Sequence, residues 1–541
     1  MAFRVVSLAL VFSCFALISH GQERFFADYY YVAPPSESAK AASADRTFAL
    51  SEDVVKQYLA EPMSSVVLDE FSEQGGGVKA LASDAPAHQV AFGLDIGMDQ
   101  ESLFGLPVMV QGDVHVFLSS IVSLDAYATR LRVDLSGLQQ GEALYVLDAQ
   151  GRAAFGPYTA SQAEGKGFWL PTTLGDTVIL ALHGTGPVCP QVRVESVSHF
   201  FKSIFSSGGG EALSCNIPIG EETNPDAAAV ASGIGILIIP YGSGQAFCSG
   251  ALITTQAPGS LPPEPYLFSA WHCFGDGVDY SGMEVFWDYR SESDDPNGLP
   301  RSYGAQLIDY NDTLDAALLK LNGPVTVGPY GRAWVGWDTQ RPVQGSRVQT
   351  IHHPRAFSMK TSRGSVTQES YQVCFDVSCS ASYEEQIEVL WSEGVTEQGS
   401  SGSPLLNRDE QYRIIGSLSN GPSHSCTNRE NNYDHYSSFS LFFPQVKCYL
   451  VPGQTCEEPY EPTNDGGCII SRLFGLQSST LSNLRQFRDE VLAKSAFGRQ
   501  LIKDYYDLGP ELEQWFEKDW CAKTAFRGAL FVGSAVGACV Q

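Results

Sequence analysis

The chain has 541 residues and a formal net charge of −27, from 61 acidic and 34 basic residues. This length exceeds what one hydrophobic core supports, and we expect about three to four domains. Such an acidic chain lacks the basic face that nucleic acids require, so we expect no nucleic-acid partner. The charge suits a soluble protein whose copies repel one another.

A secretory signal pattern opens the chain over residues 1–21. Arg4 is followed by the apolar run 5–18, which at about 14 residues is short for a membrane span. Cys14 offers a lipoprotein signal as an alternative, which the bulky Phe12 disfavours. Without Cys14, 12 of the 13 cysteines remain, and an even number in an exported chain predicts disulfide bonds. We therefore expect a secreted protein with no stable membrane span. Because no Cys-x-x-Cys pair occurs, we expect no metal, and we expect no other cofactor.

Two segments precede the middle of the chain. Residues 22–90 form a separate N-terminal segment that is rich in Ala, Ser, Glu and Pro. Residues 91–202 hold alternating segments at 129–135, 143–147 and 177–182, separated by turn residues, which predicts a small β-sandwich. A Gly-rich linker follows, and residues 203–450 show short strands with frequent Gly and Pro turns, as antiparallel barrels do.

A glycine- and serine-rich loop at residues 394–404 lies between two strand-like runs, 386–391 and 412–418. Such a loop can expose one serine hydroxyl, and its glycines let backbone N–H groups converge beside it. This is the geometry of an acyl-transfer nucleophile. The alternative is a surface turn, because Gly/Ser loops are common connectors.

Two upstream residues favour the catalytic interpretation. His272 ends one apolar strand and Asp315 opens another. A serine hydroxyl needs an imidazole to accept its proton, and the imidazole needs a buried carboxylate. Alone, His272 could be a core histidine and Asp315 a turn acid. The order His, Asp, Ser is chymotrypsin-like, and the spacing suits two consecutive six-stranded barrels. We expect a mainly β fold with a chymotrypsin-like double barrel over residues 203–450.

Over residues 213–445 the chain resembles the bacterial lysyl endopeptidases, a branch of the trypsin-like serine proteases. The matching segments are 248–252, 270–273, 285–289, 336–338, 351–354, 394–404 and 421–423, together with Asp315. The resemblance implies that His272 is the general base, Asp315 the orienting carboxylate and Ser401 the nucleophile. It also implies that the backbone N–H groups of Gly399 and Ser401 form the oxyanion hole.

The resemblance places the acid of the specificity pocket at Asp434, because Val395 occupies the position that trypsins use. Asp434 could instead be a solvated loop acid. The strand from Ser417 to Asn420 is expected to pair with the substrate backbone. Ser419 and Asn420 depart from the histidine and glycine of the family. Lysine specificity is therefore expected with arginine as an open alternative, since an aspartate pairs with either cation.

The resemblance supports a disulfide bond that pins the general base. Two further pairs are expected, and the rest of the connectivity is not readable from the sequence. The expected pairs are Cys248–Cys273, Cys215–Cys426 and Cys374–Cys379. The adjacent His352 and His353 could bind metal or supply a base, but neighbours on a strand face opposite ways and Pro354 favours a structural turn.

In the resembling family a propeptide precedes the protease, which implies that residues 22–202 assist folding and hold the enzyme inactive in cis. A permanent binding or sorting module is the alternative. Lys202 is a hypothetical activation site, because the Gly-rich linker leaves its backbone accessible. After a linker at residues 451–467, helical spacing of apolar residues predicts a C-terminal helical module at 468–541.

These patterns predict a secreted serine endopeptidase that acts on protein or peptide substrates, with cleavage after lysine. Three alternatives remain: an arginine preference, a catalytically silent protease-like binding protein, and an esterase-like hydrolase on the same fold.

Overall fold

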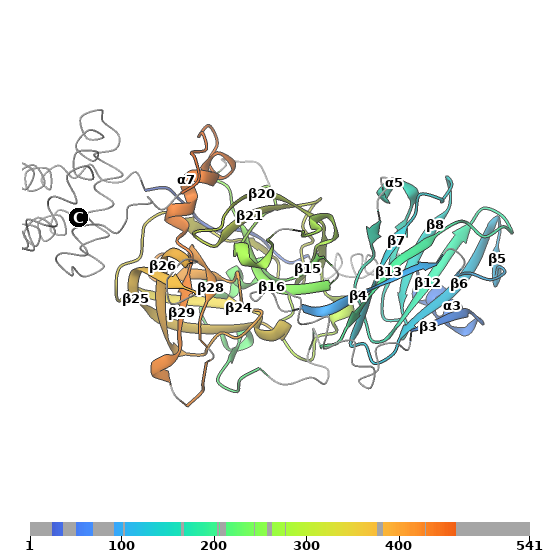
Figure 1. Ribbon diagram of the computed structural model, residues 1–541, viewed down its shortest axis with the longest axis horizontal. Coiled ribbons are helices and arrows are strands. Elements are labelled where there is room, and N and C mark those ends of the chain that lie inside the picture. Colours follow the sequence, from blue (N-terminus) through green and yellow to red (C-terminus); the bar gives the residue numbers. More distant parts are fainter. Residues whose placement is uncertain are drawn as a thin grey trace, which may run out of the picture.

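The computed structural model describes most of residues 24–460 and is mainly β, as expected (Figure 1). The described residues are 24–35, 50–68, 91–100, 103–163, 167–202, 205, 212–242, 244–256, 262–275, 277–375, 382–422, 424–427 and 429–460. The signal peptide and the C-terminal helical module expected from the sequence lie outside these residues. Within the described ranges, no helix is both long and apolar enough to cross a membrane.

A unit made largely of strands, called the β unit below, covers the described residues from 50 to 200. Its first sheet contains β3 (Ser64–Leu68), β5 (Met109–Gln111), β6 (Val114–Ser123), β8 (Ala143–Asp148), β9 (Ala154–Tyr158) and β12 (Thr177–Gly184). Its second contains β4 (Ala91–Gln100), β7 (Ala128–Asp134), β10 (Phe168–Trp169), β11 (Thr173–Leu174) and β13 (Arg193–Phe200). Buried Leu131, Val146 and Leu180 from both sheets share one core.

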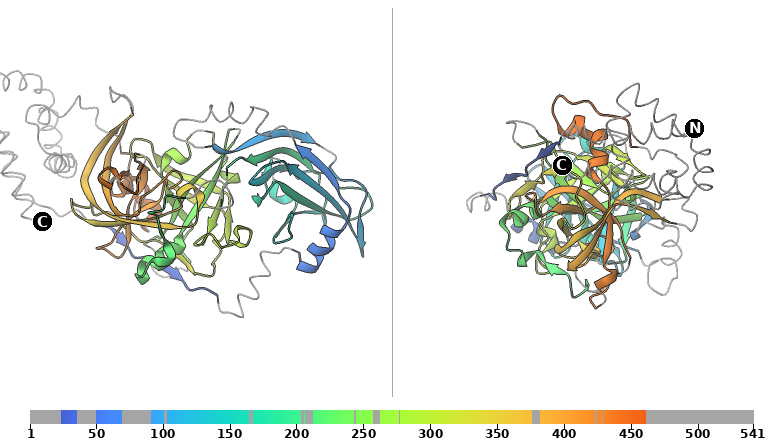
Figure 2. Two further views of the ribbon diagram at one scale, coloured as in Figure 1. Left: turned by 90° about the horizontal axis from the view of Figure 1, so that it is seen from below. Right: turned by 90° about the vertical axis from the view of Figure 1, so that its left-hand side faces the viewer.

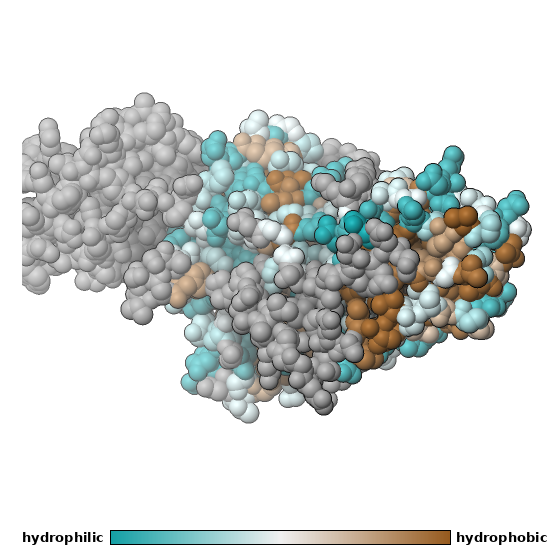
Figure 3. Space-filling view, turned by 45° about the vertical axis from the view of Figure 1, so that its right-hand side comes forward, coloured by the Kyte–Doolittle hydropathy of each residue, from teal (hydrophilic) through white to brown (hydrophobic). Residues whose placement is uncertain are grey.

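Two short helices accompany these sheets, α3 (Glu52–Ala60) and α5 (Ala160–Ala163). Helix α3 packs through Val55 and Tyr58, and the hydroxyl of Tyr58 lies 2.8 Å from Nε2 of His183. Figure 3 shows apolar residues on the surface of the β unit, at the right of the view. The exposed apolar side chains of this unit include Leu106, Val110 and Val188.

The second sheet of the β unit continues into the next part of the chain, because β4 pairs with β16 (Gly244–Ile253). The other strands of this extended sheet are β15 (Ile234–Tyr241), β17 (Tyr266–Ser269), β18 (Glu284–Trp287), β19 (Arg301–Tyr303), β20 (Ala305–Asn311) and β21 (Ala316–Leu321). Every residue of β16 is buried, so this strand lies in the interior and supports the segment that carries His272.

Buried polar contacts reinforce this junction between the β unit and the rest of the chain. The Glu284 carboxylate accepts hydrogen bonds from the Oγ1 of Thr172 at 2.6 Å and from Arg301 at 2.9 Å. Asn297 donates to the carboxylate of Asp148 at 2.9 Å. These groups are all buried, and buried polar groups need such partners to remain stable. The β unit is therefore docked through specific side chains as well as through strand pairing.

A further sheet contains β1 (Phe26–Ala27), β14 (Ile217–Pro218), β23 (Trp337–Asp338), β24 (Arg347–His352), β25 (Lys360–Cys374), β26 (Ser382–Glu393), β27 (Pro404–Asn407), β28 (Arg413–Asn420) and β29 (Tyr433–Tyr436). Helix α7 (Phe439–Leu450) covers part of it. Residues of both sheets share one large core with this helix, including Phe268, Trp337, Ile414 and Phe439. This shared core joins the two sheets.

Short helical segments connect the strands. They are η2 (Ile219–Glu221), α6 (Pro225–Val230), η3 (Ala231–Gly233), η4 (Trp271–Cys273), η5 (Tyr280–Gly282), η6 (Pro296–Gly298), η7 (Pro354–Ala356) and η8 (Arg429–Asn431).

Residues 22–90 were expected to form one N-terminal pro-segment. The described residues of this range lie in two separate places. Strands β1 and β2 (Tyr30–Val32) lie against the sheet of β23 and against β22 (Arg332–Trp334), whereas α3 and β3 belong to the β unit. Figure 2 shows both groups in blue, at opposite ends of the molecule.

Candidate active site

The histidine and the aspartate of the expected triad are in direct contact. His272 lies in η4, just after β17, and Asp315 directly precedes β21. Asp315 is fully buried and adopts a φ of 58°, which is uncommon for a residue other than glycine. Its Oδ1 accepts from the backbone N–H of His272 at 2.7 Å, and its Oδ2 lies 2.8 Å from Nδ1 of the ring. An ionised carboxylate only accepts hydrogen bonds, so Nδ1 carries the proton and Nε2 keeps a free lone pair.

Ser419 supplies a third donor to this carboxylate. Its Oγ donates to Oδ2 of Asp315 at 2.6 Å. Ser417, expected to begin the substrate strand, has a different role, because its backbone N–H, backbone C=O and hydroxyl all bond to Ser437. The backbone of Ser417 is therefore used within the fold. Asn420, at the other end of the expected substrate strand, pairs with His435 in the same sheet.

The loop that carries Ser401 is pressed against the segment leading to His272. Gly402 has a φ of 78°, and a Cβ atom added to this glycine would clash with Oγ of Ser269. Ser249 anchors the loop by donating its N–H to the Ser401 carbonyl at 2.8 Å and its hydroxyl to the Gly399 carbonyl at 3.0 Å. The Gly402 N–H donates to Leu418 at 2.8 Å, next to Ser419. Ser401 is thus tied on one side to the His272 segment and on the other to the partner of Asp315.

Two backbone donors of this loop are unused. Within the described residues, the N–H groups of Gly399 and Ser401 donate to no protein acceptor, while both carbonyls are turned toward Ser249. Free N–H groups beside a serine hydroxyl can stabilise an oxyanion. In the same described ranges, Oγ of Ser401 and Nε2 of His272 share no hydrogen bond. Such bonds are often long in ligand-free enzymes and tighten when substrate binds.

The two adjacent histidines are buried in separate structural contacts. Nδ1 of His352 lies 2.7 Å from the Ser400 hydroxyl, which also accepts from the Glu397 N–H at 3.2 Å. Nδ1 of His353 lies 2.9 Å from the carbonyl of Phe357. Burial lowers the pKa of His352 to about 3 and that of His353 to about 4. Both rings are therefore neutral near pH 7, and His352 contacts Ser400, the residue that precedes Ser401.

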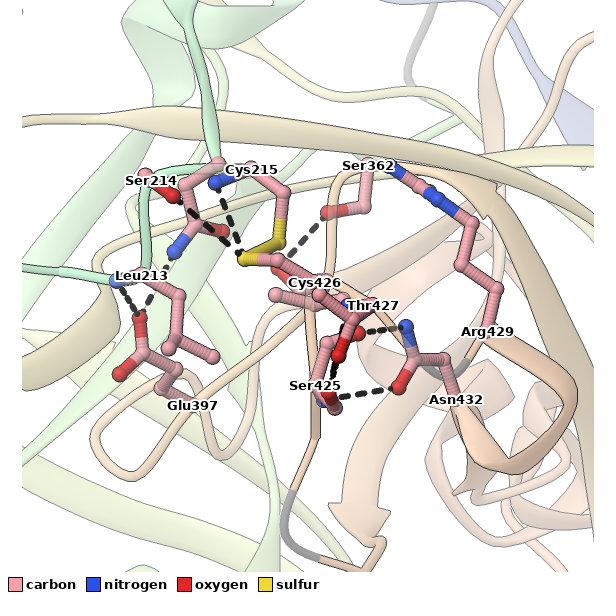
Figure 4. Close-up of a disulfide and its surroundings, with 12 residues drawn as sticks. Leu213, Ser214, Cys215, Ser362, Glu397, Ser425, Cys426, Thr427, Arg429 and Asn432 are labelled. Atoms are coloured by element: carbon pink, nitrogen blue, oxygen red, sulfur yellow. Dashed lines mark hydrogen bonds between the residues drawn. A yellow bond between two sulfur atoms is a disulfide. The ribbon is translucent and has the colours of Figure 1, made fainter.

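Glu397 connects the loop at residues 394–404, called the nucleophile loop below because it carries the candidate nucleophile, to Leu213 after the Gly-rich linker, as Figure 4 shows. Its Oε1 accepts from the backbone N–H of Leu213 and from the side chain of Asn216, both at 2.7 Å. Its Oε2 lies 2.8 Å from Nε of Arg355. Glu397 was absent from the residues expected from the sequence. The available signal was its position as the single acid in the loop 394–404.

Asp434 is buried rather than solvated, with an exposed fraction of 1%. Its Oδ2 accepts from Nε1 of Trp391 at 2.5 Å and from Oγ1 of Thr396 at 2.6 Å. Its Oδ1 lies 2.9 Å from Nε2 of His424. The same oxygen is the nearest atom to a Cβ that a side chain at Gly421 would add. Thr396 belongs to the same loop as Ser401, so this loop contacts the Asp434 carboxylate directly.

His424 was not among the expected pocket residues, yet its buried ring is paired with Asp434. Burial lowers the pKa of His424, but hydrogen bonding and charge attraction from Asp434 outweigh this effect and the net pKa is raised. Asn420 faces a different histidine, because its Oδ1 lies 2.8 Å from Nδ1 of His435. The His435 ring stacks on Tyr371 with centroids 4.6 Å apart.

Disulfide bonds brace the site. The structure contains two of the expected bridges, Cys248–Cys273 beside His272 and Cys215–Cys426 beside Leu213 (Figure 4). Cys374 is disulfide-bonded, and its expected partner Cys379 lies outside the described residues. The bridge Cys448–Cys456 was not expected. Because the sulfurs of Cys248 and Cys273 are bonded to each other, they offer no thiolate to a metal despite their closeness to His272.

The family model and the curated relative that match this chain are both lysyl endopeptidases. Residues 209–437 match the family model described as lysyl endopeptidase, C-terminal domain. The lysyl endopeptidase of Pseudomonas aeruginosa is 26% identical over 346 residues, which cover 60% of this chain and 72% of that protein. The active form of the Rv3671c protease from M. tuberculosis is 13% identical, with 47% of this chain and 96% of that chain covered and a TM-score of 0.29. The serine endoprotease from Yersinia pestis is 15% identical, with 42% and 68% covered and a TM-score of 0.27.

The protein is a serine endopeptidase, as the family match and the curated relative indicate. Within that class, residues 209–437 are similar to the lysyl endopeptidases, which confirms the resemblance expected from the sequence motifs.

Proposed function

We propose that the protein is a secreted endopeptidase that hydrolyses peptide bonds on the C-terminal side of lysine, with His272, Asp315 and Ser401 as its catalytic triad. The observation that carries the proposal is the fully buried Asp315 carboxylate, which holds the ring of His272 with Nε2 left as the base. The two sheets on either side of the site would be the two barrels of a chymotrypsin-like fold.

In the proposed mechanism, Oγ of Ser401 attacks the carbonyl carbon of the scissile bond while Nε2 of His272 accepts its proton. Asp315 stabilises the imidazolium that forms. The negative oxygen of the tetrahedral intermediate accepts from the N–H groups of Gly399 and Ser401. The intermediate collapses to an acyl-enzyme, and His272 returns the proton to the leaving amine. A water molecule then repeats the sequence to release the acid product.

The hydrogen bonds of Asp434 favour lysine over arginine. A carboxylate has about four acceptor positions. Two donors, Trp391 and Thr396, occupy Oδ2, and His424 occupies one position of Oδ1. One position remains. A lysine ammonium is a compact charge that can use a single acceptor, whereas arginine gains most from donating to both oxygens at once.

Export is proposed from the disulfide bonds, which persist in oxidising compartments. The described residues from 212 to 450 are called the protease part below. The β unit is proposed as a cis-acting pro-region, because it is docked onto the protease part through β4 and the buried contacts of Glu284.

Matched peptide amides that differ only in lysine or arginine before the scissile bond test the proposal. The processed enzyme should cleave the lysine substrate preferentially, and Ser401→Ala should reduce kcat by at least about 10³-fold. Asp434→Asn should reduce kcat/KM for the lysine substrate by roughly 30- to 1,000-fold, as expected for losing one partner of a buried charge pair. Equal turnover by the wild type and Ser401→Ala would refute the mechanism, and unchanged specificity in Asp434→Asn would refute the pocket.

A further inference from the structure

The first described residues form an N-terminal arm, residues 24–32, that adds two short strands to the protease part. In β1, Phe26 pairs with Asp338 and Ala27 with Trp337. In β2, Tyr30, Tyr31 and Val32 pair with the residues of β22 (Arg332–Trp334). An extended segment that pairs with a sheet in this way is held by its backbone irrespective of its connection to the rest of the chain.

Side chains of the arm are part of the protease core. Ala27 is 7% exposed and belongs to the cluster that contains Trp337 and Phe443. The rings of Phe25 and Phe443 have centroids 5.4 Å apart, and those of Tyr30 and Trp334 are 5.9 Å apart. Removing the arm would expose these aromatic residues to water, at a cost proportional to the apolar area.

Charges also fasten the arm. The carboxylate of Asp338 is almost fully buried, and Arg24 forms an ion pair with it. A buried carboxylate is costly unless it is paired, and its other cation, Arg413, lies 3.5 Å away. Arg413 also binds Asp28 of the arm at 2.6 Å. The hydroxyl of Tyr29 donates to Asp226 at 3.0 Å.

Gly336 lies directly against the backbone of the arm. The three atoms nearest to its Cβ position are the carbonyl oxygen of Ala27 at 2.4 Å, the amide nitrogen of Tyr29 at 2.8 Å and the carbonyl carbon of Asp28 at 3.0 Å. All three are backbone atoms of the arm, which cannot move aside as a flexible side chain could. The absence of a side chain at position 336 therefore allows the arm to approach.

The path of the chain separates the arm from the β unit. After Val32 the arm is complete, and α3 and β3 already belong to the β unit. The chain returns to the protease part through Leu213 and β14. The arm and the β unit are therefore separate partners of the protease part, attached at different strands.

We propose that the N-terminal arm is a structural strand of the mature protease, which stays bound as a separate peptide after the chain is cut on both sides of the β unit. The partner of the surface formed by β22, β23 and Gly336 is thus residues 24–32 of the same chain. The proposal concerns binding, so it stands or falls independently of the proposed function.

The test uses the full chain carrying Ser401→Ala, with recognition sequences for a site-specific protease inserted near residues 42 and 208. After cleavage, the arm peptide should co-elute with the protease part in size-exclusion chromatography and be identified by mass spectrometry. Gly336→Ala should release it and lower Tm by at least about 4 °C. Gly220→Ala is the matched control, because nothing lies within 4 Å of that Cβ position.

Ala27→Asp, which changes the arm alone, should also release the peptide while the cleaved protease part remains folded by circular dichroism. An arm peptide that separates from the wild-type protease part would overturn the proposal. So would a peptide that stays bound in both Gly336→Ala and Ala27→Asp.

Discussion

The hydroxyl of Ser419 donates a 2.6 Å hydrogen bond to Oδ2 of Asp315, the same oxygen that faces Nδ1 of His272. This contact joins β28, which lies beside the nucleophile loop, to the carboxylate that precedes β21 in the extended sheet of β16. The Asp315 carboxylate therefore accepts hydrogen bonds from three donors, the backbone N–H and Nδ1 of His272 and Oγ of Ser419, which fix its orientation. The orientation of the imidazole therefore depends on a residue from the opposite sheet.

Ser419→Ala should lower kcat/KM for a lysine amide by about 10-fold, because a hydrogen bond to a charged group contributes roughly 1.5–3 kcal/mol. Steady-state kinetics measure this change. Ser417→Ala is the control, since its hydroxyl bonds to Ser437 and not to the carboxylate. It should lower Tm without changing kcat/KM. Equal kinetic losses in the two variants would contradict the special position of Ser419.

Thr396→Val should reduce the preference for lysine over arginine by about 10-fold. The substitution keeps the shape of the side chain but removes the hydroxyl donor to Oδ2 of Asp434. The freed acceptor position would allow a guanidinium to contact both oxygens. The ratio of kcat/KM values for the paired lysine and arginine amides measures this effect. An unchanged ratio would show that the occupancy of Oδ2 does not control the choice of cation.

His424 should make substrate binding weaker in acid. The pKa of His424 is raised above its ordinary value of 6.5, so below that pH its imidazolium pairs with Asp434 and competes with the substrate ammonium. KM for a lysine amide should rise as pH falls through this range, and His424→Gln should flatten the profile. A KM profile with the same slope in both proteins would contradict this role.

The pair of His424 and Asp434 should stabilise the folded protein in acid, although it weakens substrate binding in acid. A group whose pKa is raised in the folded state stabilises the protein below its unfolded pKa, and this contribution disappears as pH rises through the folded pKa. In the Ser401→Ala background, the contribution of His424 to Tm should therefore be full below about pH 6 and be lost above its raised pKa. The difference in Tm between this protein and its His424→Gln derivative should shrink with rising pH.

Glu397→Ala should lower kcat by about 10-fold with little change in KM. The carboxylate holds the nucleophile loop to Leu213 and Arg355 and makes no contact with the pocket acid. Its loss should misplace the N–H groups of Gly399 and Ser401, which act in the transition state. The matched control is Glu393→Ala, an exposed acid paired with Arg363, because surface ion pairs contribute little. A change in KM alone would contradict a positioning role.

Local patterns predicted much of what surrounds the site. The apolar strands that precede His272 and follow Asp315 are β17 and β21, and the glycines of the loop 394–404 have the positive φ values that such a loop needs. These features depend on neighbours in the sequence. They are also the features that carry the resemblance to lysyl endopeptidases.

Contacts between distant segments could not be predicted in this way. The different roles of Ser417 and Ser419 depend on how β28 pairs with β29, where the register shifts between Leu418 and Asn420. The contact of Glu397 with Leu213 joins residues 184 positions apart. The N-terminal arm pairs with strands about 300 residues away, and no local pattern in the arm could predict that pairing.

The most direct test of the catalytic triad is covalent labelling of the processed enzyme with a fluorophosphonate, followed by peptide mapping. The reagent reacts with a serine hydroxyl that a neighbouring base has activated. We predict one phosphonylated residue, Ser401, and almost complete loss of labelling in His272→Ala. Labelling of a different residue, or equal labelling of the wild type and His272→Ala, would contradict the account.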